Sequence, residues 1–229
     1  MRVTIARMRP SVLLPLAAHV PGVARAYGIP CRLPREDAVA VTFDDGPHPE
    51  GTPAVLDALD AAGAKATFFL VGEQVERRPE LAREIAARGH AVGVHGYRHR
   101  LLLKRTRRGL ADDLDRAAEL IAEATGAAPL YYRAPYGVFS NASLALARQR
   151  GWIPFLWSRW GRDWERRATG EAIARRAAGR LVAGDVVLLH DADYYSSAGS
   201  WRDTLEALPA ILEAAASLGV SWIPLTHAT

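Results

Sequence analysis

Two pairs of residues in this chain have the types and spacing of a metal site. Asp44 and Asp45 are adjacent and precede a Gly-Pro turn, and His95 and His99 are four positions apart. Four-residue spacing places two imidazoles on one side of a helical turn, where they can bind a first-row divalent metal ion. With Asp45, the histidines make a two-histidine, one-carboxylate set that leaves coordination positions open for water and substrate. The pattern therefore predicts a catalytic rather than a structural metal ion.

Further polar residues follow apolar runs and could complete such a site. Arg133 stands in Arg-Ala-Pro-Tyr, where its guanidinium can pair with a carboxylate and the following peptide nitrogens can face a reacting oxygen. His190 ends the apolar run 185–190, and a histidine there can donate a proton if a carboxylate holds its other nitrogen. Asp163 and Trp164 are two adjacent residues that could also contribute to the site. Taken singly, each residue is also compatible with a structural role, such as a surface arginine or a core histidine.

Strands alternate with helices along the chain, and this order must position the motifs. Near-continuous apolar strands between helices imply parallel pairing. No Gly-rich phosphate loop follows the first strand, so a closed or nearly closed barrel is favoured over an open sheet. The carboxyl ends of barrel strands carry the active site, and the motifs stand at such ends. The predicted strands are 38–43, 66–71, 91–94, 130–133, 152–158, 185–190 and 220–224, and the predicted helices are 52–62, 79–88, 110–125, 141–150, 169–180 and 204–218.

Composition limits the class of protein. The chain has 229 residues, 49% apolar and 24% charged, which excludes a disordered, collagen-like or coiled-coil chain. A net charge of +4, spread along the sequence, is poor evidence for nucleic-acid binding, so no nucleic-acid partner is expected. The single cysteine, Cys31, excludes an intrachain disulfide and a Cys-x-x-Cys metal site.

The motifs together resemble those of the polysaccharide deacetylases, the NodB-homology domains of carbohydrate esterase family 4. The resemblance covers about residues 37–224 and implies an irregular (β/α) barrel of about seven parallel strands. It also implies metal-dependent removal of N-acetyl groups, mostly from N-acetylglucosamine units of peptidoglycan or chitin-like polymers. Gly96 departs from the family, which usually has Ser or Thr there, and this bears on loop rigidity and substrate preference more than on the metal. The matching motifs are 42–47, 95–99, 133–136, 163–164 and 189–191.

Amide hydrolysis gives the polar residues complementary roles. One divalent ion would bind at the two-histidine, one-carboxylate set, with zinc expected first because imidazole suits it, and cobalt or manganese also compatible. Asp44 would act as general base, and Arg133 would keep it ionised. His190 would protonate the leaving amine. These roles predict a hydrolase acting on carbon–nitrogen bonds of an acetylated carbohydrate.

The resemblance implies the remaining site residues. Asp163 would fix the tautomer of His190 and support its charge. The backbone N–H of Tyr136 would face the oxyanion, and Trp164 and Leu188 would wall a small pocket for the acetyl methyl group.

Other functions and partners stay open at this point. The same residues would serve a deacylase of a lipid-linked sugar or of a non-sugar amide, whereas a non-catalytic glycan-binding barrel is disfavoured because every catalytic residue is present. The segment Arg98–Arg108 carries six basic residues around three leucines beside the predicted metal site. It could contact an anionic polymer or a membrane surface, or it could be a solvated loop. The oligomeric state is not predicted.

We interpret residues 1–36 as an N-terminal arm and residues 37–229 as the deacetylase domain. Three early arginines, the apolar stretch 11–20 and Ala-Arg-Ala at 24–26 are the parts of a signal peptide, but prolines at 10, 15 and 21 interrupt or flank the stretch. The alternative is an ordered or membrane-surface arm, because the stretch is too short to span a bilayer. A cell-wall substrate would imply an extracytoplasmic or membrane-peripheral location, which the sequence leaves undecided.

Overall fold

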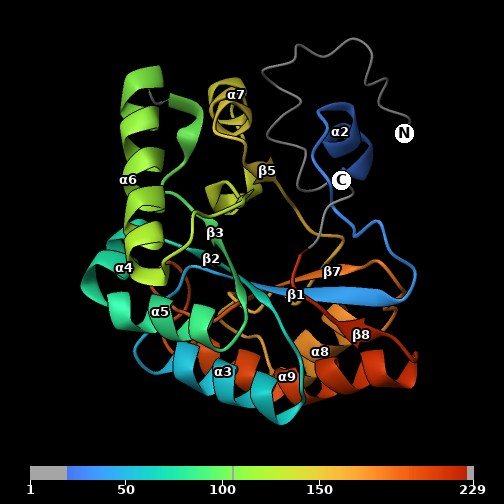
Figure 1. The fold of residues 1–229 in the computed structure, drawn as a ribbon. Coiled ribbons are helices and arrows are strands. Elements are labelled where there is room, and N and C mark those ends of the chain that lie inside the picture. Colours follow the sequence, from blue (N-terminus) through green and yellow to red (C-terminus); the bar gives the residue numbers. More distant parts are fainter. Residues whose placement is uncertain (1–19, 105, 226–229) are drawn as a thin grey trace.

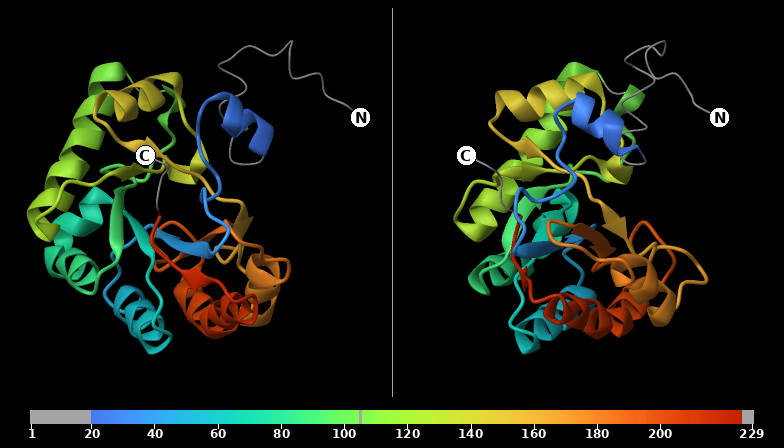
Figure 2. Two further views of the ribbon diagram at one scale, coloured as in Figure 1. Left: turned by 45° about the vertical axis from the view of Figure 1, so that its right-hand side comes forward. Right: turned by 90° about the vertical axis from the view of Figure 1, so that its right-hand side faces the viewer.

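A curled sheet of parallel strands forms the centre of the computed structural model, which describes residues 20–104 and 106–225 (Figure 1). The strand order is β5-β4-β3-β2-β1-β7-β6, and β8 pairs with the first two residues of β1. Helices cover the outside of the curl (Figure 2). The predicted irregular barrel of about seven parallel strands is therefore confirmed. The strands are β1 (Ala38–Asp44), β2 (Thr67–Leu70), β3 (Ala91–Val94), β4 (Tyr131–Tyr132), β5 (Ile153–Pro154), β6 (Arg159–Trp160), β7 (Val186–His190) and β8 (Ser221–Trp222).

Helices connect most of the strands, as the alternating pattern predicts. Thr106, Ser140 and Thr169 begin three of them, and each side chain accepts a hydrogen bond from a backbone N–H of the first turn. No helix in the described ranges is long and apolar enough to cross a membrane. The helices are α2 (Pro21–Ala26), α3 (Gly51–Ala61), α4 (Gly72–Arg77), α5 (Pro79–Ala87), α6 (Arg107–Thr125), α7 (Asn141–Gln149), α8 (Gly170–Ala178) and α9 (Ser200–Ser217), with 3₁₀ turns η3 (Leu102–Lys104) and η4 (Pro135–Gly137).

Of the strand predicted at 152–158, only β5 forms, and a second short strand, β6, begins just beyond the predicted range at the opposite edge of the sheet. β5 pairs with β4 and β6 pairs with β7, and no β5–β6 pairing joins these edges in the described part of the chain. Between them the chain crosses the opening of the curl, where the carbonyls of Phe155 and Leu156 accept hydrogen bonds from the buried guanidinium of Arg133. Past the end of β5, the apolar run therefore provides hydrogen-bond acceptors for a buried cation.

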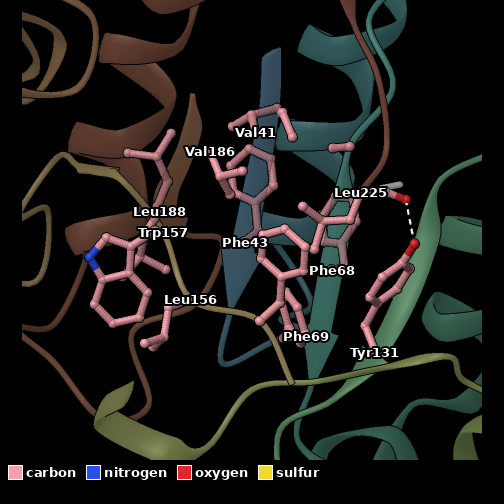
Figure 3. Close-up of a cluster of buried hydrophobic side chains, with 14 of the residues drawn as sticks. Val41, Phe43, Phe68, Phe69, Tyr131, Leu156, Trp157, Val186, Leu188 and Leu225 are labelled. Atoms are coloured by element: carbon pink, nitrogen blue, oxygen red, sulfur yellow. Dashed lines mark hydrogen bonds between the residues drawn. The ribbon is translucent and has the colours of Figure 1, made fainter. Parts of the chain in front are cut away.

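Aromatic and branched side chains pack on both faces of the curled sheet (Figure 3). On the face toward the helices, the rings of Phe43 and Phe68 stack with centroids 5.1 Å apart. The Tyr131 hydroxyl donates a 2.7 Å hydrogen bond to the carbonyl of Leu225, whose N–H donates to the Thr67 hydroxyl at 2.9 Å. Burying each phenylalanine stabilises the fold by about 1.5–3 kcal/mol. The contacts of Tyr131, Leu225 and Thr67 lie inside the curl at the amino ends of β4 and β2, which leaves the carboxyl ends of the strands for polar chemistry.

The described part of the N-terminal arm packs against the barrel. Val23 and Ala24 of α2, together with Ile29 and Leu33, are buried in the main hydrophobic cluster. Residues 1–19, which hold almost all of the signal-like stretch, lie outside the described residues. The signal-peptide interpretation and the domain boundary after residue 36 therefore stay predictions.

Candidate metal centre and catalytic pocket

The polar motifs meet at the carboxyl ends of the strands. Asp44 is the last residue of β1 and lies beside His190, the last residue of β7, in the parallel register. His95 directly follows β3, and Arg133 directly follows β4. Parallel strands bring their carboxyl ends to one edge, which explains why residues far apart in the sequence converge here.

Asp45, His95 and His99 form a compact set of potential metal ligands. One ligand atom from each residue lies within 4.8 Å of the others. Asp45 Oδ1 lies 3.4 Å from His95 Nε2 and 3.3 Å from His99 Nε2, yet it has no hydrogen-bond partner among the described residues. A buried carboxylate oxygen without a hydrogen-bond donor, facing two imidazole nitrogens, is suited to a shared cation. The residues therefore fit the metal ion that their types predict.

Asp45 and His99 have the protonation states that a metal ion requires. Burial raises the pKa of the Asp45 carboxyl, but the surrounding imidazoles outweigh this effect and bring the pKa to about 2. Burial lowers the pKa of His99 to about 4, against the opposing charge of Asp45. At neutral pH, Asp45 is therefore ionised and His99 is neutral, so both have lone pairs available to a cation.

A tight turn after β1 directs the Asp45 carboxylate. Asp45 has a φ of 81°, a left-handed conformation that costs about 1–3 kcal/mol for a residue other than glycine. A Cβ atom at Gly46 would collide with the carboxylate of Asp191, which the Thr52 hydroxyl holds in place. The turn therefore needs glycine at this position to bring Asp45 into the site.

Asp44 is held by a fully buried arginine rather than by histidine. Arg133 Nη1 donates hydrogen bonds of 2.7 Å to Asp44 Oδ1 and 2.8 Å to the Thr42 hydroxyl. The guanidinium also lies 4.0 Å from the centre of the Phe69 ring. Breaking one partner of such a buried pair leaves an uncompensated charge and costs about 3–5 kcal/mol. Arg133 thus fixes one oxygen of Asp44, and the other oxygen, Oδ2, lies 3.7 Å from His95 Nε2.

His190 and Asp163 form a second charged pair. His190 Nδ1 lies 2.9 Å from Asp163 Oδ1, and Asp163 Oδ2 accepts hydrogen bonds from the His190 backbone N–H and the Thr204 hydroxyl. Burial lowers the pKa of His190, but the Asp163 carboxylate outweighs it and the pKa rises to about 10. His190 is therefore protonated at neutral pH, with Nε2 turned toward Asp45 Oδ2 at 3.9 Å.

A cavity of about 220 Å³ joins these groups. Tyr136, Trp164 and Leu188, to which the resemblance assigns binding of the acetyl group, are among its lining residues. Tyr136 has a φ of 60°, and no hydrogen bond from its backbone N–H to another described residue is found. The full lining is Asp44, Asp45, His95, His99, Tyr136, Gly137, Trp157, Trp160, Trp164, Leu188, His190, Tyr195 and Ser196.

Several residues of the site escaped prediction from the sequence. Trp157 and Trp160 line the cavity, and their position shortly before Asp163 in the sequence could have predicted this. Thr42 forms a hydrogen bond with Arg133, and Thr204 forms one with Asp163. A single threonine in a strand or helix has no sequence pattern that would predict such a contact.

The loop after β3 is held without a hydroxyl at position 96. Gly96 has a φ of 84°, a conformation that favours glycine. Its carbonyl accepts a 2.9 Å hydrogen bond from the Gly72 N–H, and the Tyr97 N–H donates at 2.9 Å to Asp113 Oδ2 of α6. These contacts fix the loop that carries both histidines.

The predicted basic segment, residues 98–108, begins beside His99. Arg98 and Arg100 are exposed, and so are Leu101 and Leu103, with 49% and 44% of their surfaces open to solvent. Arg105 lies outside the described residues. The structure therefore places charge and apolar surface next to the cavity, and contact with a membrane or polymer stays a prediction.

Comparison with known proteins gives one consistent family. The sequence model described as polysaccharide deacetylase matches residues 32–153, more than half of the chain. A peptidoglycan-N-acetylglucosamine deacetylase of Bacillus cereus is 32% identical over 187 residues, covering 82% of this chain and 66% of that protein. The chain thus spans slightly under two thirds of this relative. A chitooligosaccharide deacetylase of Azorhizobium caulinodans is 32% identical over 197 residues, covering 83% of this chain and 93% of the relative.

A solved structure extends the similarity to the fold. The peptidoglycan N-acetylglucosamine deacetylase Bc1960 aligns with a TM-score of 0.81 at 30% identity, covering 89% of this chain and 94% of that one. The matched regions contain the strand ends that carry Asp44, His95 and Arg133. Sequence and fold therefore agree, and this chain belongs to the polysaccharide deacetylase family.

Proposed function

We propose that this chain is a metal-dependent hydrolase that removes the N-acetyl group from N-acetylglucosamine units of a peptidoglycan-like or chitin-like glycan. The names of the relatives, a peptidoglycan and a chitooligosaccharide deacetylase, support this substrate class. The observation that carries the proposal is a single cavity onto which a base held by arginine, a set of metal ligands and a protonated histidine all open.

Asp45, His95 and His99 are the residues that would hold the metal ion. Zinc is the first candidate because imidazole suits it, and cobalt or manganese fits the same donors. When bound, the ion polarises the amide carbonyl and lowers the pKa of a water molecule. Asp45 Oδ1, which has no hydrogen-bond partner within residues 20–104 and 106–225, supports this assignment.

Asp44 is the general base of the proposed reaction. Its Oδ1 accepts a hydrogen bond from Arg133, and this contact orients the carboxylate. Oδ2 remains to take a proton from the attacking water. Asp44 is nearly fully buried but lines the cavity, so a water molecule bound there can reach it.

His190 is the general acid that protonates the leaving amine. An amine leaves readily only when protonated, and the Asp163 contact keeps His190 in the charged form that can supply the proton. The edge of Trp164 packs against the His190 ring with centroids 5.4 Å apart, which restricts its rotation. His190 is therefore both charged and held in place.

Tyr136, Trp164 and Leu188 would bind the acetyl group. The Tyr136 backbone N–H is a donor for the developing oxyanion. Trp164 and Leu188 supply the apolar wall for the methyl group. Each of these three residues, which the resemblance implied, therefore has a proposed role in binding the acetyl group.

The test is release of acetate from a panel of acetylated chitooligosaccharides, peptidoglycan fragments, lipid-linked sugars and simple acetanilides. We expect release from the first two, with Asp44→Asn as the inactive matched control. Release from simple amides alone would show a non-sugar amidase. Binding of glycans with no release from any substrate would show a non-catalytic barrel.

We propose, as a second candidate, a lipid-linked sugar at an anionic membrane surface. Exposed Leu101 and Leu103 beside exposed arginines favour it, because a leucine can enter the interface while arginine meets lipid phosphate. The chemistry of the site would be the same as for a glycan polymer. The two candidate functions differ only in that this substrate lies at a membrane surface.

A further inference from the structure

The two histidines of the metal set are held in different ways. His95 Nδ1 lies 2.8 Å from the carbonyl oxygen of Arg133, a contact that fixes both its tautomer and its ring orientation. His99 has no such contact, since its buried Nδ1 has no hydrogen-bond partner among the described residues. Metal-binding histidines almost always have a hydrogen bond at the second nitrogen. Some other contact must therefore orient His99.

Two tyrosine rings enclose the His99 imidazole. Tyr195 stacks on it with centroids 4.3 Å apart and an interplanar angle of 18°. Tyr136 meets it edge-on, with centroids 4.4 Å apart and an angle of 61°. Rotation of the imidazole away from Asp45 would drive it into one of these rings. Of the two rings, the stacked ring of Tyr195 restricts rotation of the His99 imidazole more.

Tyr195 is itself anchored by side chains of α4. It lies in the loop between β7 and α9, and its hydroxyl donates a 2.8 Å hydrogen bond to Glu73 Oε1 and accepts a 3.2 Å hydrogen bond from Gln74 Nε2. Glu73 and Gln74 belong to α4. A helix that contributes no catalytic residue therefore holds the hydroxyl end of Tyr195, in addition to the stacking of its ring on His99.

We propose that Tyr195 is a positioning residue for the metal site, whose ring holds His99 with Nε2 facing Asp45 in place of a hydrogen bond. This inference rests on the metal site of the proposed function. A ligand that is already oriented loses less conformational freedom when the ion binds, so affinity is higher. Removing the ring should lower metal affinity by about 10–100-fold, as removal of other supporting contacts does.

Two substitutions separate the ring from the hydroxyl. Tyr195→Leu removes the aromatic face, whereas Tyr195→Phe keeps the face and loses only the contacts to Glu73 and Gln74. The measurement is the zinc dissociation constant, obtained by competition with a chromophoric chelator, for variants whose thermal unfolding matches wild type. We expect Tyr195→Leu to bind zinc about 10–100-fold more weakly and Tyr195→Phe to retain most of the affinity.

Tyr27→Leu is the matched control. This half-buried tyrosine directly follows α2 in the N-terminal arm and does not line the catalytic cavity, so its substitution should leave zinc affinity unchanged. If Tyr195→Leu does not fold, Tyr195→Ile and Tyr195→Trp provide the same comparison of aliphatic and aromatic side chains.

The outcomes distinguish this inference from the metal site itself. His99→Ala should lose tight zinc binding. If His99→Ala binds zinc as wild type does, the proposed metal site is wrong. If His99→Ala loses zinc but Tyr195→Leu binds it normally, only the positioning role fails. Equal losses in Tyr195→Phe and Tyr195→Leu would also overturn the role of the ring, because the hydroxyl contacts would then carry the effect.

Discussion

Asp44 and Asp45 are neighbours in the chain, but their carboxylates have different partners. Asp44 is tied to Arg133, whereas Asp45 faces two imidazoles and has an oxygen without a hydrogen-bond partner in the described part of the chain. Two adjacent aspartates in the sequence indicate a site but do not by themselves divide the roles. The division into base and ligand was predicted with the family resemblance, and the arginine contact supplies its physical reason.

The role of Asp44 can be tested without disturbing the metal. Asp44→Asn keeps the size of the side chain and its contact with Arg133 but cannot take a proton. We expect kcat to fall about 10²–10⁴-fold, the range typical of a lost general base, with unchanged metal content. Steady-state kinetics and elemental analysis on one preparation check this. Loss of metal in proportion to activity would identify Asp44 as a ligand instead.

The His190–Asp163 pair predicts a specific change with pH. A general acid works only while protonated, so the alkaline limb of kcat/KM reports the pKa of His190. Burial lowers that pKa and Asp163 raises it to about 10, so Asp163→Asn should move the alkaline limb to lower pH and slow the reaction. The measurement is kcat/KM as a function of pH for both proteins, and an unmoved limb would contradict the assignment.

An activated substrate provides the control for His190. The amine of an amide must be protonated to leave, whereas the aryl oxide of an aryl acetate leaves without a proton. His190→Ala should therefore slow amide hydrolysis far more than aryl acetate hydrolysis. Equal slowing of both would show that His190 does not protonate the leaving group.

Among the helices and strands, the sequence predicts best the bounds of those with an uninterrupted pattern of apolar residues. β1, β7 and α6 lie close to their expected ranges because each has one continuous pattern of apolar residues. The run at 152–158 has the same pattern, yet only Ile153 and Pro154 form a strand, and the next two carbonyls accept hydrogen bonds from Arg133, a residue distant in the sequence. The short helix α4 was missed because six residues are too few to show a helical period.

The basic segment gives a prediction of its own. Wild-type protein should bind vesicles rich in anionic phospholipid at low salt more strongly than neutral vesicles. Leu101→Ser combined with Leu103→Ser should weaken binding roughly tenfold or more, because two leucines no longer enter the interface. Co-sedimentation with vesicles of the two compositions measures both effects.

Leu130→Ser is the control for this experiment. Leu130 is 55% exposed and precedes β4, at the opposite end of the strands from the basic segment, so its loss should not affect vesicle binding. Equal, weak binding of wild-type protein to anionic and neutral vesicles would show that the segment is a solvated loop.

The whole molecule is a barrel packed at one end and polar at the other. Alternating strands and helices predicted this arrangement, and polar motifs at strand ends predicted which residues meet. The sequence did not predict the residues that hold the site residues in place. Thr42, Thr204 and Tyr195 act through contacts that the closed fold creates, and none belongs to a pattern of spacing.

The central claim is that acetate release depends on a divalent ion at Asp45, His95 and His99. The direct measurement is acetate release from acetylated chitooligosaccharide by protein depleted with a chelator and then titrated with zinc, with metal content determined at each step. We predict that activity falls toward that of Asp44→Asn on depletion and returns with about one ion per chain, and that His99→Ala does not recover. Full activity in protein shown to be metal-free, or full recovery by His99→Ala, would contradict the account.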